Sequence, residues 1–85
     1  MVRKWRLVGV ISEIDTDRKL VELIEQRWNK EDEEWEDGTD AQGNILTYVL
    51  TYDQDLEEKL DKAFENSDVI TVKVHENKIV KIEGF

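Results

Sequence analysis

The sequence predicts a mainly β domain in which one helix separates the third strand from the fourth, in the order β-β-β-α-β-β. Short segments rich in β-branched and aromatic residues are separated by turn formers, and one segment repeats its apolar residues at helical spacing instead. The length of 85 residues indicates a single domain, 1–85, because a chain of this size buries only one core.

Residues 2–28 predict a hairpin that begins with a long first strand. Apolar side chains change parity around Gly9, which is typical of a β-bulge or a sharply coiled strand, so we expect Gly9 to bend this strand. Residues 15–17 are turn formers, and β-branched and long apolar residues resume over 19–28. A helix over 18–28 is the alternative, since several apolar residues there also fit helical spacing, but a short turn favours an antiparallel return.

Residues 29–44 predict either a long loop or two strand extensions joined by a turn near residues 30–33. The extensions would bring Trp28 and Trp35 together across a hairpin, and such a pair contributes ~0.2–1 kcal/mol. Residues 40–44 predict a tight turn with Gly43 available for a positive φ. The next segment, 45–52, is rich in β-branched and aromatic residues and predicts the third strand.

The helix is expected over residues 53–66. Asp55 with Glu58 three residues on matches a capping box, Asp53 is an alternative cap, and Asn66 is the expected stop. Alternating apolar residues over 69–75 and 79–85, joined by a turn at 76–78, predict the last two strands.

Five strands with one helix between the third and fourth, and a glycine within a long first strand, resemble the OB-fold, a partly open five-stranded Greek-key barrel. The resemblance covers residues 2–84, and an open α+β sheet is the structural alternative. It implies one core, with the helix closing one end of the barrel. The core residues we expect are Val8, Val10, Leu23, Leu50, Leu60, Phe64, Ile70, Val72, Val74, Val80 and Ile82.

The composition also resembles that of de novo designed proteins. Cysteine and proline are absent, methionine occurs only at position 1, and the expected helix is capped and rich in Glu and Lys. Without cysteine there is no disulfide, thiol nucleophile or thiolate metal site. A membrane span needs ~20 apolar residues and a signal peptide an apolar stretch of ~7–15, so we expect a soluble cytoplasmic protein that does not enter a membrane.

Candidate chemical groups are sparse. His75 is the one histidine and is expected to face solvent, and the carboxylates lie in runs, so we expect no enzymatic activity. Asp37, Asp40 and Asn44 do not match the spacing of a calcium-binding loop. We therefore expect no metal ion and no cofactor.

Nucleic acid is an unlikely partner on charge grounds. OB-folds often stack single strands on aromatic residues, and Trp28, Tyr48 and Tyr52 would offer rings, with Arg27 and Lys30 nearby. The net charge is −9, however, and residues 31–40 carry seven acids and no base. Such a segment repels phosphates.

The function we expect from the sequence is that of a monomeric, non-enzymatic scaffold of designed type that requires no partner. The alternative is a natural acidic interaction module that presents carboxylates where a basic protein partner expects phosphates. The partner-binding residues in that case are Trp28, Glu31, Asp32, Glu33, Glu34, Trp35, Glu36 and Asp37.

Overall fold

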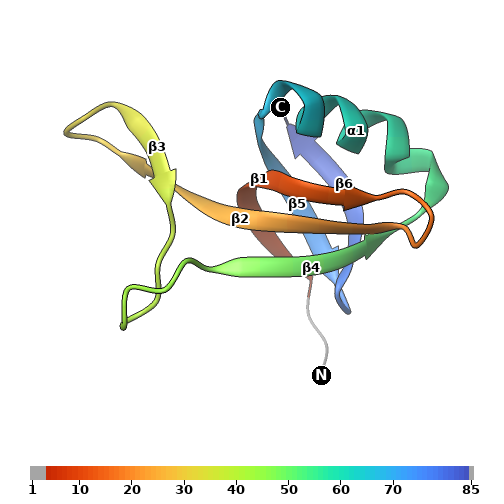
Figure 1. Cartoon of the computed structure of the whole chain (residues 1–85), viewed down its shortest axis with the longest axis horizontal. Coiled ribbons are helices and arrows are strands. Elements are labelled where there is room, and N and C mark those ends of the chain that lie inside the picture. The colour runs from red at the N-terminus through yellow and green to blue at the C-terminus, as the bar shows by residue number, and fades with distance from the viewer. Residues whose placement is uncertain (1–3, 85) are drawn as a thin grey trace.

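The computed structural model describes residues 4–84, which form six strands and one α-helix (Figure 1). A short 3-10 turn, Gln54–Leu56, leads directly into the helix α1, Glu57–Asn66. The strands are β1 Trp5–Asp15, β2 Leu20–Asn29, β3 Glu34–Asp37, β4 Thr47–Tyr52, β5 Val69–His75 and β6 Lys78–Gly84.

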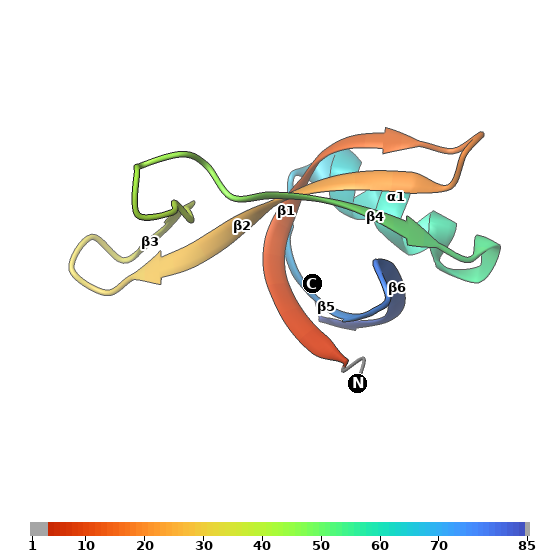
Figure 2. The same cartoon turned by 90° about the horizontal axis from the view of Figure 1, so that it is seen from below.

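Five strands form a closed barrel in the order β1-β5-β6-β4-β2, with β2 pairing back onto β1. All pairs are antiparallel except β4 with β6, a parallel seam of two residue pairs, Thr51 with Lys78 and Tyr52 with Ile79. The mainly β fold, the strand order and the helix between β4 and β5 agree with the predicted OB-fold-like architecture. The barrel differs from the expectation in being closed at this seam, and β3 is an additional strand outside it (Figure 2).

The bend of β1 is real, but its cause differs from the prediction. The first half of β1 pairs with β5 and the second half with β2, so the strand turns from one neighbour to the other (Figure 2). Leu7, Gly9 and Ile11 all face inward, and the register shifts only between Ile11 and Glu13. The parity change we expected at Gly9 is therefore wrong, because the bulge lies at Ser12.

Glycine is needed at position 9 because the backbone of β2 comes very close to β1 there. A Cβ built on Gly9 would lie 2.7 Å from the backbone oxygen of Ile24 on β2. The φ of Gly9 is not positive, so close backbone approach, and not backbone conformation, requires glycine here.

The core confirms part of the predicted set. Leu23, Leu50, Leu60, Ile70, Val72 and Val74 are buried as expected, and Ile82 packs against them. Val8 and Val10 are only half-buried because β1 keeps the parity of Leu7 through Gly9. The full buried set is Leu7, Ile11, Val21, Leu23, Leu50, Tyr52, Leu60, Ala63, Ile70, Val72, Val74 and Ile79.

Val80 and Phe64 were wrongly predicted to be buried. The β5–β6 register shifts between Lys73 and Val74, so Val80 is the extra residue and faces solvent while Ile79 takes the inner position. Helix α1 covers one end of the barrel (Figure 1). It buries Leu60 and Ala63 and leaves Phe64 exposed.

The helix ends where the sequence indicates but begins differently. It stops at Asn66, and Ser67 adopts a left-handed conformation that closes the last turn on Ala63 and Phe64. The predicted capping box is wrong, because Leu56 occupies the N-cap position of α1 and no side chain caps it. The alternative cap, Asp53, does occupy the N-cap position of the 3-10 turn, but its carboxylate makes no capping bond and pairs with Lys78 at 2.7 Å.

The turns are as predicted. Asp15 accepts the backbone N–H groups of Asp17 and Arg18 at 3.1 Å each, which closes the β1–β2 turn, so residues 20–29 form a strand and the helical alternative is wrong. Glu76 and Asn77 both have positive φ in the β5–β6 turn.

Candidate interaction surface

The feature that distinguishes this barrel is a hairpin arm that projects from it (Figures 1 and 2). Strand β2 extends beyond its pairing with the barrel strand β4. Residues 20–24 pair with β4, whereas Gln26–Asn29 pair with β3. The arm, defined as residues 26–37, is therefore an ordered two-stranded ribbon. This confirms the strand-extension arrangement over the loop alternative.

Local side-chain contacts close the tip of the arm. The amide oxygen of Asn29 accepts the backbone N–H groups of Glu31 and Asp32 at 2.9 and 3.1 Å. Glu33 adopts a left-handed conformation with φ 51° and returns the chain into β3. The sequence therefore supplies its own turn at residues 30–33 without a glycine.

Trp28 and Trp35 are directly opposite each other in the arm. Their ring centroids lie 5.3 Å apart at an interplanar angle of 69°, an edge-to-face arrangement. Such pairs contribute ~0.5–1.5 kcal/mol beyond the area they bury. Both indoles nevertheless remain about half exposed, at 49% and 45%. The pair thus orders the arm and leaves large aromatic surfaces toward solvent.

A polar contact joins the two strands of the arm at its base. The side-chain amide of Gln26 donates to the carboxylate of Asp37 at 2.7 Å, and Gln26 is only 8% exposed. The backbone N–H of Gly38 donates to the carbonyl of Glu25 at 2.7 Å, and the N–H of Leu46 donates to the carbonyl of Gly38. Sequence reasoning missed Gln26, because an isolated glutamine in a strand gives no signal of burial.

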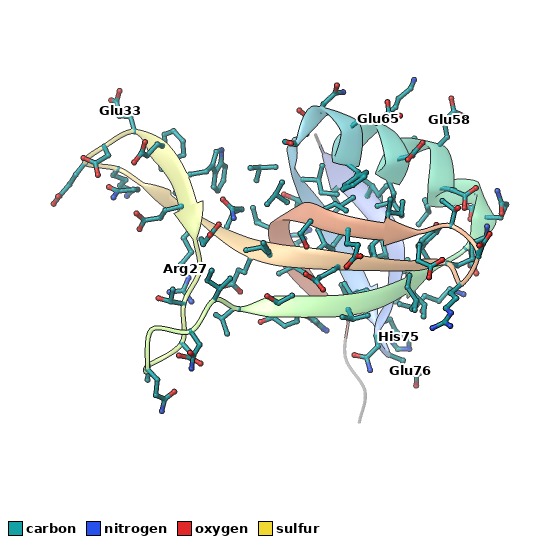
Figure 3. All side chains as sticks on the ribbon, viewed as in Figure 1. Arg27, Glu33, Glu58, Glu65, His75 and Glu76 are labelled. Carbon is teal, nitrogen blue, oxygen red and sulfur yellow. The ribbon has the colours of Figure 1, made fainter. Side chains whose placement is uncertain are left out.

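The structure separates the predicted binding residues onto two faces. Side chains alternate along a strand, so Trp28 and Trp35 share one face with Gln26 and Asp37. Glu34 and Glu36 lie on the opposite face with Arg27 and Asn29. The predicted partner-binding residues therefore do not share one surface: the ribbon has an aromatic face, which also carries Asp37, and an acidic face. Glu31, Asp32 and Glu33 occupy the tip between them, where Figure 3 shows Glu33 pointing outward.

The acids of the arm are free of ion pairs within the described part of the chain. Arg27, the base on the acidic face, pairs with Glu25 at 3.1 Å instead of with Glu36 opposite it. Among residues 4–84 no ion pair involves an acid between positions 31 and 40. The carboxylates are thus left without a cation from this chain.

The aromatic residues considered for nucleic acid do not form one platform. Tyr52 is buried in the barrel, and Tyr48 packs inside against Trp5, with ring centroids 5.4 Å apart. Trp28 lies apart from both, in the arm, where it is exposed. Residues 3–6, Arg-Lys-Trp-Arg, form a further basic and aromatic segment. Arg6 pairs with Glu83 at 2.8 Å, which neutralises part of the charge of this segment, and Arg3 lies outside the described residues.

Tyr52, Glu57 and Lys19 form a polar cluster at the start of the helix. Glu57 accepts from the Lys19 ammonium at 2.8 Å and from the Tyr52 hydroxyl at 3.1 Å. The hydrogen bond from Lys19 lowers the pKa of Glu57, and burial, aided by Glu57, raises the pKa of Tyr52 to about 12. The two contacts of Glu57 tie the start of the helix to the β1–β2 turn and to β4.

Asp40 is a turn-closing residue. Its carboxylate accepts the backbone N–H groups of Asn44 and Gln42 at 2.9 Å each, and the bond from Asn44 is the main cause of its lowered pKa. Asp37 is engaged by Gln26. Across residues 4–84 the structure contains no group of three His, Cys, Asp or Glu side chains arranged to hold a metal ion.

His75 is less exposed than predicted. It is half-buried at the end of β5, and within the described chain its Nδ1 atom is buried without a hydrogen-bond partner. The expectation of a solvated histidine is therefore wrong; Figure 3 shows His75 beside Glu76 at this end of the strand.

One shallow depression, with a volume of about 200 Å³, lies on the outer side of the barrel. Its lining is open and mostly acidic or aliphatic, and it brings no nucleophile or base together with a positive charge. The lining residues are Glu13, Asp15, Leu20, Val21, Glu22 and Val49.

Comparison of the chain with protein-family models, with curated proteins and with solved structures finds no match. The helix between residues 57 and 66 is too short and too polar to cross a bilayer, and the described residues form no other α-helix.

Proposed function

We propose that this chain is a non-enzymatic protein-interaction module whose arm binds a basic protein surface. The observation that carries the proposal is the ordered ribbon, which projects two half-exposed tryptophans from a barrel that does not need them for its core. Tryptophan is enriched at interface hot spots because it buries a large area at little entropic cost.

The charges of the arm determine the kind of partner. The carboxylates on the acidic face and at the tip lack ion pairs within residues 4–84, so lysine or arginine side chains of a partner would meet unopposed acids. Complementary charge of this kind raises the association rate and excludes acidic partners. The same charge opposes binding of nucleic acid.

The test compares two double variants that remove the same charge from different places. E34Q/E36Q neutralises the acidic face of the arm, and E58Q/E65Q neutralises two exposed helix acids that Figure 3 shows far from Glu33. Binding of short polylysine is followed by tryptophan fluorescence at ~0.15 M salt, where the field of distant charges is screened.

We expect E34Q/E36Q to weaken binding clearly more than E58Q/E65Q does. Equal effects of the two variants would mean that polylysine responds only to net charge, and the arm would lose its assigned role. An absence of polylysine binding to the unmodified chain would also contradict the proposal.

A designed scaffold without evolved activity is the alternative function. The absence of cysteine and proline and the self-sufficient turns support it. A designed scaffold is expected to unfold only at very high temperature and not to bind polylysine, whereas an interaction module is expected to bind it.

A further inference from the structure

The arm ends in a strand edge that is unpaired within the described chain. β3 is the terminal strand in the sheet order and pairs only with β2, and all four of its residues, Glu34–Asp37, are exposed. A strand edge presents a row of backbone N–H and C=O groups that a further strand can join. The outer edge of β3, defined as its side away from β2, is such an edge.

Alternation decides which backbone groups lie on the outer edge. The N–H of Gly38 donates to the carbonyl of Glu25, so Gly38 points toward β2. Residues two and four positions earlier, Glu36 and Glu34, direct their backbone groups the same way. The N–H and C=O groups of Trp35 and Asp37 therefore point outward, on residues that are exposed.

The side chains beside this edge exclude a second copy of the chain. Three of the four residues of β3 are acidic, and the turn before it adds Glu31, Asp32 and Glu33. Two such edges brought together would place carboxylates opposite carboxylates, which destabilises the pairing. A strand with lysine or arginine at alternate positions would place cations opposite the same carboxylates.

Building on the proposed binding of a basic partner, we propose that the partner adds as an extended strand to the outer edge of β3. Its backbone hydrogen-bonds to Trp35 and Asp37, and its lysine or arginine side chains lie beside Glu34 and Glu36. Side chains on its other face lie beside the Trp35 ring, which accepts an aliphatic stem. Backbone bonds supply affinity in this mode, and alternate side chains supply selectivity.

The first test uses a capped, labelled peptide of about eight residues that alternates valine and lysine, within the usual length of a strand. Fluorescence anisotropy measures its affinity for the full chain. Two analogues carry N-methyl groups, on the valine amides in one and on the lysine amides in the other. N-methylation removes amide donors of one parity and leaves the charge unchanged.

Strand addition predicts that one analogue loses affinity about tenfold or more while the other binds like the parent peptide. The valine analogue is the weak one if the strands are antiparallel, and the lysine analogue if they are parallel. Equal affinity of all three peptides overturns strand addition while binding of a basic partner stands. Binding of polylysine without binding of the parent peptide also overturns strand addition alone, whereas loss of both overturns the proposed function.

A matched pair of protein variants tests the same edge from the other side. Asp37→Pro removes the outward N–H, and Asp37→Ala removes the same carboxylate but keeps that N–H. We expect the proline variant to bind the parent peptide several-fold more weakly than the alanine variant, and equal affinities would contradict the proposal. The exciton couplet of the Trp28–Trp35 pair in circular dichroism verifies that each variant retains the arm.

Discussion

Replacing Gly9 with valine is expected to destabilise the barrel, although valine favours strands and glycine does not. The Cβ would lie 2.7 Å from the backbone oxygen of Ile24 and 3.4 Å from its carbonyl carbon. These are backbone atoms of the paired strand, so no side-chain rotation relieves the contact and β1 must move away from β2. Overpacking of this kind costs ~1–3 kcal/mol.

A matched control distinguishes this contact from the general effect of replacing glycine. Gly84 lies in β6, and a Cβ added there meets nothing within 4 Å. Gly84→Ala should therefore leave stability unchanged or raise it by ~0.4–1 kcal/mol through the unfolded chain. In thermal unfolding, a destabilisation of 1 kcal/mol lowers the Tm of a domain of this size by ~4–8 °C. An unchanged or raised Tm for both Gly9→Val and Gly9→Ala would refute the close approach.

The remaining predictions concern the core, pH and nucleic acid. Val72 is fully buried, so Val72→Ala should cost ~1–3 kcal/mol in chemical denaturation, whereas Val49→Ala, at a position 59% exposed, should stay within ~0.5 kcal/mol; similar losses would contradict the core. The lowered pKa of Glu57 stabilises the fold above the ordinary value of 4.5, and this contribution is lost as the pH falls through the folded pKa. The Tm of Glu57→Gln should therefore fall less steeply with acid than that of the parent, and parallel curves would show that the contacts of Glu57 do not stabilise the fold. Single-stranded oligonucleotides should bind more weakly than micromolar in anisotropy at ~0.15 M salt, and micromolar binding would overturn the electrostatic argument.

The kinds of elements and most of their ends could be predicted from local sequence patterns. Strands β4 and β5 follow from dense β-branched residues, and the turns at Asp15 and Asp40 follow from carboxylates that accept nearby backbone N–H groups. These features depend on residues only a few positions apart. The order of the elements was then enough to predict the OB-fold-like strand order.

Which strand faces are buried, and where strands approach one another closely, depends on contacts between distant parts of the chain. Val10 and Val80 look like core residues by alternation, but bulges at Ser12 and Val80 change the inner parity of β1 and β6. A bulge depends on the register between strands that are far apart in sequence, so it cannot be predicted from the alternation of apolar residues in one strand.

The candidate site in the arm also has features that the sequence indicated and features that it did not. The sequence indicated the cross-strand pairing of Trp28 with Trp35, because both flank a turn of suitable composition. Once this pairing is assumed, the alternation of a strand also places Glu34 and Glu36 on the face opposite the indoles. The sequence did not indicate that the backbone of Asp37 points to an open edge, because that depends on the hydrogen-bond register between β3 and β2.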